Sequence, residues 1–250
     1  MRLNIAVDGI KEVQQQLRFS DRRLAASAAT ALTRTAAAAR DDVKAAMPSV
    51  FDRPTPYTLG GVGMKGATAQ TLEAEVFIKD QQSGDRGGRP AAVYLRPQVR
   101  GGGRRLKAVE RVLRALGALP AGLQVVPGAG ASIDQYGNLA REQLTKIIRQ
   151  LRTQRVSGPV QPRKRIAAAR SAGGTFFVMP PGRKGAAPGI YARDFSGRNI
   201  TPVILFARPA SYRARFDFEG IVTRSVQQRL RPQLEQAIGE SFGRLLARGG

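Results

Sequence analysis

The stretch AASAATALTRTAAAAR, residues 25–40, decides the fold of the first part of the chain. Alanine has the highest helix propensity of all residues, so this stretch is a strong helix former. Apolar or small side chains recur through and beyond it at spacings of three and four residues, with one gap of two turns, at positions 13, 17, 24, 28, 32, 35, 39 and 43. This period predicts one amphipathic helix from about 10 to 47, capped by Asp8. We expect it to end at Met47, because Pro48 disfavours helical geometry in the residue before it.

A second long helix is predicted near the other end of the chain. Apolar residues share one helical face there: Ile221, Val222, Val226, Leu230, Leu234, Ile238, Phe242 and Leu245. Pro232 falls inside this pattern, where it either kinks the helix or begins a second one. Two shorter helices are predicted between the ends, over residues 106–116 and over residues 138–151 with Asn138 as the cap.

Strands are predicted where apolar residues alternate with polar ones or form short runs bounded by turn residues. These segments are residues 2–7, 70–79, 91–97, 175–179, 189–195 and 200–209. The last two flank the turn sequence SGRN, which indicates a hairpin.

The predicted order of elements is typical of an α+β fold, in which long N- and C-terminal helices pack on an antiparallel sheet. We assign residues 1–80 and 175–250 to this core domain. Residues 81–174 form a basic insertion with two short helices, and its last part, residues 153–174, is expected to be a flexible arm, because it is basic and interrupted by proline and glycine.

The net charge of the chain is +23, from 41 basic and 18 acidic residues. Residues 81–140 carry +6 and residues 141–193 carry +11, against +2 for residues 1–80 and +4 for residues 194–250. Like charges repel one another and oppose folding, so this concentration indicates a polyanionic or acidic partner.

The composition also excludes several classes of site. The chain has no cysteine and no histidine, which excludes disulfides, thiolate zinc sites, cysteine nucleophiles and the commonest general base. We expect no cofactor, no bound metal and no enzyme activity. Glu73 and Glu75 share a strand face, but without a third acidic partner a solvated face explains them better. No run reaches the length of a membrane span, and no signal peptide is expected.

Two groups of cations are candidates for contact with nucleic acid or with an acidic protein. The first surrounds the glycines of RPQVRGGGRRLK, residues 96–107, and comprises Arg96, Arg100, Arg104, Arg105 and Lys107. Glycines there would let the backbone approach a phosphate at the start of the following helix. The alternative is a flexible loop whose arginines are solvated or paired with a neighbouring subunit. A nucleotide pocket is not expected, because the spacing differs from that of a P-loop.

The second group lies in the most basic third of the chain and comprises Arg152, Arg155, Arg163, Lys164, Arg165 and Arg170. Phosphate contact is favoured over a solvated tail for this group. Aromatic residues are sparse around it, so binding is expected to be independent of base sequence.

Several stretches resemble one known family. IAVDGIKEVQQQL and ATALTRTA near the start, and NITPVILFARPASYRARFDFEGIVTRSVQQRLRPQLEQAI near the end, resemble the minor tail protein Z, or tail completion, family of tailed phages. The resemblance covers roughly the first 60 and the last 55 residues, and a weaker likeness extends to phage neck and tail-terminator proteins.

The resemblance implies a structural virion protein at the head-proximal end of the tail. It would assemble with itself as a ring, hexameric by the usual tail symmetry, bind other tail and neck proteins, and join the tail to the head. It would be made in the bacterial host cytoplasm. We expect the basic middle of the chain to contact double-stranded DNA at the genome end and expect no membrane partner. Two alternatives remain: a free, sequence-independent nucleic-acid-binding protein, and a tail terminator or adaptor that binds only protein.

Overall fold

A computed structural model describes residues 1–6, 21–81, 89–156, 175–183, 185–194, 196 and 199–246. The chain forms two compact units. Unit 1 comprises Met1–Gly102 and Tyr212–Gly250, and unit 2 comprises Gly103–Ser211. Each unit combines helices with an antiparallel sheet, so the chain has the α+β fold class that the sequence predicts.

Unit 1 is built on a three-stranded antiparallel sheet in the order β1-β3-β2. The strands are β1 (Arg2–Ala6), β2 (Val62–Lys65) and β3 (Glu73–Ile78). The strands predicted at residues 2–7 and 70–79 are therefore confirmed. One face of the sheet is buried, because Ala74, Val76 and Ile78 alternate along β3 with more exposed residues, as expected for a half-buried strand.

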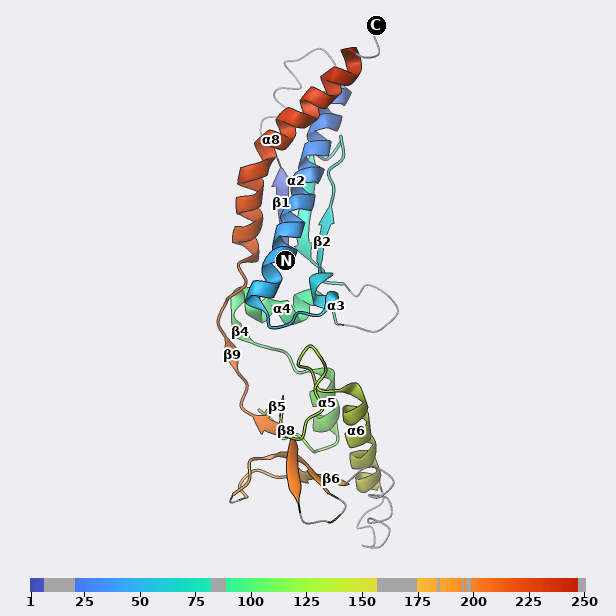
Figure 1. Ribbon diagram of the computed structural model, residues 1–250, viewed down its shortest axis with the longest axis vertical. Coiled ribbons are helices and arrows are strands. Elements are labelled where there is room, and N and C mark those ends of the chain that lie inside the picture. The colour runs from blue at the N-terminus through green and yellow to red at the C-terminus, as the bar shows by residue number, and fades with distance from the viewer. Residues whose placement is uncertain are drawn as a thin grey trace. The chain divides into compact units, whose positions relative to one another are not determined.

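Two long helices cover this sheet and lie side by side (Figure 1). α2 (Asp21–Val50) packs on β2 and β3 and also along α8 (Phe218–Leu246). The helices are antiparallel, because Arg34 early in α2 pairs with Glu240 late in α8 and Asp42 pairs with Arg229. The Arg34–Glu240 distance is 3.1 Å. These pairs are partly exposed, so their contribution to stability is small, and the helix pair is held mainly by packing.

Small side chains bring α2 close to its neighbours. Most of its buried positions are alanine: Ala25, Ala28, Ala29, Ala31, Ala36 and Ala39. Leu32, Val43 and Met47 are the larger members of the same buried stripe, and all three are fully buried. The alanine-rich stretch therefore does more than favour helix, because its small side chains allow α2 to contact the sheet and α8 at once.

Each of the two long helices contains a proline: Pro48 lies inside α2 and Pro232 lies inside α8. α2 continues past the predicted end at Met47 to Val50, and the Phe51 N–H donates to the Met47 carbonyl at 2.9 Å. The expected end is wrong because full burial of Met47 keeps the last turn helical despite Pro48. Pro232 is exposed within α8, so the carbonyl that loses its donor faces water at little cost. The predicted start of the first helix, residues 8–20, lies outside the described residues.

The structure contradicts the strand predicted at residues 91–97. They belong to the helix α4 (Ala91–Arg100). The other short helix of unit 1 is the one-turn helix α3 (Pro56–Leu59), which precedes β2. Ala91 and Leu95, four residues apart, are buried in the core of unit 1. A spacing of four places both on one helical face. Pro97 lies inside the helix, where it has no N–H to donate to the Val93 carbonyl.

Unit 2 contains a four-stranded antiparallel sheet in the order β5-β8-β7-β6. Its strands are β5 (Gln124–Pro127), β6 (Thr175–Met179), β7 (Gly189–Arg193) and β8 (Ile200–Ala207). The strand at residues 175–179 and the hairpin of β7 and β8 are confirmed, although the pairing shifts register at Ile190/Tyr191.

Two helices pack on one face of this sheet. They are α5 (Ala108–Ala115) and α6 (Arg141–Val156), which are neighbours in unit 2 (Figure 1). Leu113 of α5 and Ile147 and Leu151 of α6 share a core with side chains of the strands. Asn138 does not cap α6 as expected. It donates instead to Asp134 within a small turn, and α6 begins three residues later.

The division between the units differs from the expected one. The sequence assigns residues 175–211 to the core domain with the terminal helices, but β6, β7 and β8 form one sheet with β5 and belong to unit 2. Conversely, α4 belongs to unit 1. Hydrogen bonding and core packing decide the division, and neither follows the boundary in composition from which it was predicted.

The stripe on α2 can be tested by adding volume. We expect Ala36→Leu to destabilise unit 1 by about 1–3 kcal/mol, because a fully buried alanine has no space beside it for three more carbons. Ala26→Leu, on the exposed side of the same helix, is the matched control and should change stability by less than about 0.5 kcal/mol. Urea denaturation followed by circular dichroism would measure both, and equal effects would contradict the proposed packing.

Candidate functional site

The three glycines at residues 101–103 have a backbone role. Gly101 and Gly102 adopt φ angles of +75° and +91°, which side-chain-bearing residues rarely adopt. They follow the end of α4 and lead into β4 (Gly102–Gly103), which pairs with β9 (Ser211–Tyr212). A Cβ atom on Gly101 would also lie 3.2 Å from the Tyr212 carbonyl oxygen. Gly101 and Gly102 are therefore explained by a sharp turn into a paired strand, and nothing in the structure requires glycine at position 103.

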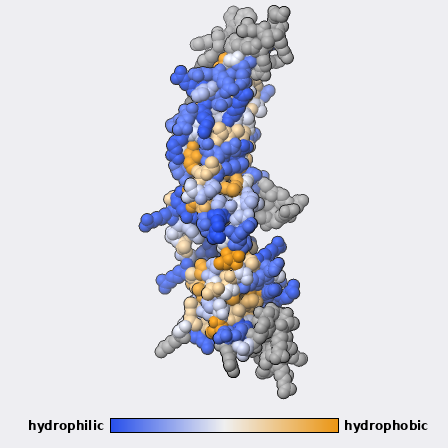
Figure 2. All heavy atoms as spheres, viewed as in Figure 1, coloured by the Kyte–Doolittle hydropathy of each residue, from blue (hydrophilic) through white to orange (hydrophobic). Residues whose placement is uncertain are grey.

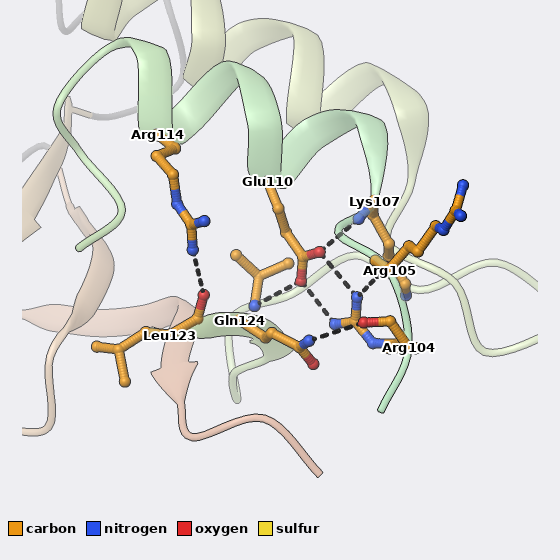
Figure 3. Close-up of polar contacts among 8 residues, drawn as sticks. Arg104, Arg105, Lys107, Glu110, Arg114, Leu123 and Gln124 are labelled. Atoms are coloured by element: carbon orange, nitrogen blue, oxygen red, sulfur yellow. Dashed lines mark hydrogen bonds and ion pairs between the residues drawn. The ribbon is translucent and has the colours of Figure 1, made fainter. Parts of the chain in front are cut away.

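Arg104, directly after the glycines, is held by a carboxylate of its own unit (Figure 3). Its guanidinium donates to both oxygens of Glu110, with Nη1 to Oε2 at 2.8 Å and Nη2 to Oε1 at 2.6 Å. Glu110 is fully buried and the Arg104 side chain is 17% exposed. A two-bond pair of this kind is the strongest that arginine forms with a carboxylate. Arg104 is thus part of the internal structure of unit 2.

Glu110 also accepts two backbone N–H groups. The Lys107 N–H at the start of α5 donates to Oε2 at 2.5 Å, and the Val125 N–H of β5 donates to Oε1 at 2.9 Å. A carboxylate from the same helix therefore occupies the place where a phosphate would meet the helix start. The expectation that this N-terminus cradles a phosphate with Arg104 is not supported, because the Lys107 N–H and the Arg104 guanidinium already bind Glu110.

The surroundings of Glu110 change its pKa in two opposing directions. Burial alone raises the pKa of the carboxyl. The hydrogen bonds from Arg104, Val125 and Lys107, together with the charge of Arg104, outweigh burial and lower the pKa to about 2. Glu110 is therefore charged at every pH at which the protein would function.

Arg105 and Lys107 are the exposed members of this group. The Arg105 side chain points away from Glu110, as Figure 3 shows. Burial among protein atoms disfavours the charged form of Lys107 and so lowers its pKa. The nearby Arg104 cation lowers the pKa further, and the negative charge of Glu110 partly offsets both effects. Arg105 is therefore accessible to a partner, whereas the Lys107 side chain is exposed but its ammonium is partly surrounded by protein.

The helix α6 has one apolar side and one side lined by glutamines. Ile147 and Leu151 face the core. Gln150 accepts the Phe176 N–H at 3.1 Å and Gln154 donates to the Phe176 carbonyl at 3.1 Å, so the two amides satisfy the outer edge of β6. Gln143 likewise binds the backbone of loop residues 130–132, because it accepts the Ser132 N–H at 2.8 Å and donates to the Gly130 carbonyl. These contacts fix the rotation of α6 about its axis relative to the sheet of unit 2.

The remaining side of α6 is basic. Its exposed cations are Arg141, Lys146, Arg149 and Arg152, which we call the α6 basic face. At about 100° per residue they lie within an arc of about 140°. Glu142 is the one acidic residue of α6, and within the described part of the chain no ion pair engages the four cations. Figure 2 shows hydrophilic side chains projecting from unit 2 beside the start of α6.

The other predicted residues are divided between the units. Arg96 and Arg100 are exposed on α4 in unit 1. Arg152 lies in the α6 basic face, and Arg155 lies in the last turn of α6, with its side chain outside the described residues. The remaining four predicted cations also lie outside the described residues: Arg163, Lys164, Arg165 and Arg170.

Arg141, Lys146 and Arg149 were missed as candidates. Their sequence signal is a recurrence at three to five residues opposite the apolar period of Leu144, Ile147 and Leu151. Runs of consecutive cations do not reveal such a face, because cations on one helical face are separated in the sequence.

Glu73 and Glu75, which share a face of β3, have different surroundings. Glu75 pairs with Arg2 at 3.4 Å and Glu73 is exposed. No group of three acidic side chains within the described ranges could hold a metal ion. Likewise, none of the described helices is both long and apolar enough to cross a membrane.

Comparisons with known protein families, curated proteins and solved structures found no match to this chain.

The role of Glu110 can be tested by removing its charge. We expect Glu110→Gln to destabilise unit 2 by about 3–5 kcal/mol, because Arg104 then lacks its buried counter-charge and one backbone N–H lacks an acceptor. Amide hydrogen exchange at Val125 reports directly on this site. Arg111→Gln, an exposed change on the same helix, is the control and should leave the exchange rate unchanged. Unaltered protection of Val125 in Glu110→Gln would contradict the assignment.

The same site predicts a dependence of stability on pH. The folded state lowers the pKa of Glu110 from 4.5 to about 2, so its contribution is complete above pH 4.5 and is lost as the pH falls towards 2. The difference in unfolding free energy between wild type and Glu110→Gln should shrink by on the order of 3 kcal/mol over this window. Denaturation curves at pH 6 and pH 2.5 would measure it, and a constant difference would disprove the linkage.

Proposed function

We propose that this chain is a structural virion protein at the head-proximal end of a phage tail. It assembles with itself as a ring and joins the tail to the head, and its basic unit faces the end of the genome. The proposal combines the resemblance of the terminal segments to the tail completion family with the division of residues and charge between the two units.

The observation that carries the proposal is the joining of the two terminal segments in unit 1. Two of the stretches that resemble the family, residues 29–36 in α2 and residues 218–238 in α8, pack together around one core. Residues 199–211 belong to unit 2, and residues 7–17 lie outside the described residues. Segments that form one unit can be preserved together as an assembly module. This supports an interpretation in which unit 1 is the scaffold of the ring.

The distribution of charge supports a division of labour between the units. Unit 2 carries 19 basic and 4 acidic residues, whereas unit 1 carries 22 basic and 14 acidic residues. In a ring, one copy of unit 2 per subunit would repeat its net charge of +15 around the axis. Such a concentration of one sign of charge attracts a polyanion over long range at low salt.

The test is the location of the chain in whole particles of the phage that encodes it. We expect mass spectrometry to detect it in purified particles, and cryo-electron microscopy to show a ring between the head and the tail tube. Deleting the gene should leave filled heads and separate tails, because the joining step is lost. Particles that lack the chain and assemble normally without it would exclude the proposal and favour a free nucleic-acid-binding protein.

A further inference from the structure

We propose that the α6 basic face, formed by Arg141, Lys146, Arg149 and Arg152, is a binding site for the phosphates of duplex DNA. Binding there is independent of base sequence. This inference rests on the proposed function in one respect: the genome end is the DNA that such a face would meet in a particle. The contact itself follows from the chemistry of the helix.

The dimensions of the face suit a phosphate backbone. At about 1.5 Å per residue, α6 rises roughly 16 Å between Arg141 and Arg152. Duplex DNA carries one negative charge per about 1.7 Å of its axis, so several phosphates lie within that length. Arginine and lysine side chains are long enough to follow the curve of a strand from a straight helix, and arginine can contact a phosphate through two parallel hydrogen bonds.

The other side chains on the face favour nucleic acid over an acidic protein. Between and beside the cations the exposed residues are Glu142, Thr145 and Thr153. Protein interfaces have an apolar centre in which aromatic and other large side chains contribute most of the affinity. The α6 basic face has no such centre. It also lacks an aromatic residue on which an unpaired base could stack, so a duplex is favoured over a single strand.

The helix is held in place before any partner arrives. Its apolar side is packed in the core of unit 2, and Gln143, Gln150 and Gln154 are hydrogen-bonded to the loop and to the edge of β6. The four cations therefore begin from a rigid backbone, and binding orders only their side chains. Preorganisation of this kind lowers the entropic cost of association.

The experiment measures binding of the purified full-length chain to a 30-base-pair duplex of arbitrary sequence, by fluorescence anisotropy over about 50–200 mM salt. The test variant replaces Arg141, Lys146, Arg149 and Arg152 with glutamine. Glutamine keeps helix propensity, so α6 should remain folded. The matched control replaces with glutamine four exposed cations of unit 1 that are not candidates for nucleic-acid contact: Arg23, Lys65, Arg213 and Arg231. Both variants lose the same charge.

We expect the α6 variant to bind at least about tenfold more weakly than the control at 100 mM salt. Its plot of log affinity against log salt should be shallower by about 3 to 4, since each phosphate contact contributes about 0.9. A third variant with lysine at the three arginines keeps every charge and should keep the wild-type slope. A scrambled duplex should bind equally well.

Three results would overturn the inference. The first is equal loss of affinity in the α6 variant and the unit 1 control, which would mean that only total charge matters. The second is an unchanged salt slope in the α6 variant. The third is negligible DNA binding at 150 mM salt together with binding to an acidic polypeptide such as polyglutamate, which would assign the face to a protein partner. Circular dichroism of each variant confirms that the helices are retained.

The proposed function and this inference can fail separately. If the chain forms a ring in particles but the α6 variant binds DNA normally, the inference is wrong and the structural role stands. If the α6 variant loses DNA binding but the chain is absent from particles, the binding site stands and the virion role is wrong.

Discussion

The structure of unit 2 depends on one buried carboxylate. Glu110 binds Arg104, the start of α5 and the Val125 N–H of β5, and so connects the segment after the glycines, a helix and a strand. A buried charge without partners would be strongly destabilising, and here each oxygen accepts at least two hydrogen bonds. α5 and α6 share a core with the sheet, so the position of α6 depends in turn on this arrangement.

Pairing with Glu110 distinguishes Arg104 from other cations that look alike in the sequence. Arg104 has an internal partner and contributes to the fold. The residues of the α6 basic face have none among the described residues and contribute to the surface. Net charge alone therefore overstates what is available to a partner. The cations that a partner can contact are those left exposed after internal pairing, and on α6 these cations lie on one face.

The two units differ in how they use their helices. In unit 1, α2 is buried between a sheet and α8, and its alanines serve close packing. In unit 2, α6 is buried on one side only, its glutamines bind neighbouring backbone, and its third side is free. A helix that is packed on two sides is suited to a scaffold. A helix that is fixed on two sides and open on the third is suited to presenting a charged surface.

Much of the secondary structure could be predicted from sequence, because periodicity is a local property. The long helices, the strands at residues 2–7, 70–79 and 175–179, and the hairpin of β7 and β8 follow from residue spacing, short apolar runs and turn residues. The strand predicted at residues 91–97 is wrong because a short apolar run bounded by prolines fits a strand as well as a buried helix segment, and burial of Ala91 and Leu95 on one helical face decides between them.

The sequence by itself determined the α+β class, the long terminal helices and the excess of positive charge in the middle of the chain. Only the tertiary structure decided where the units divide, which arginine is internal and which cations share a face. Those properties depend on contacts between residues far apart in the sequence. Packing and desolvation decide that β5 pairs with β8 and that the Val125 N–H donates to Glu110. The local sequence carries no signal for either contact.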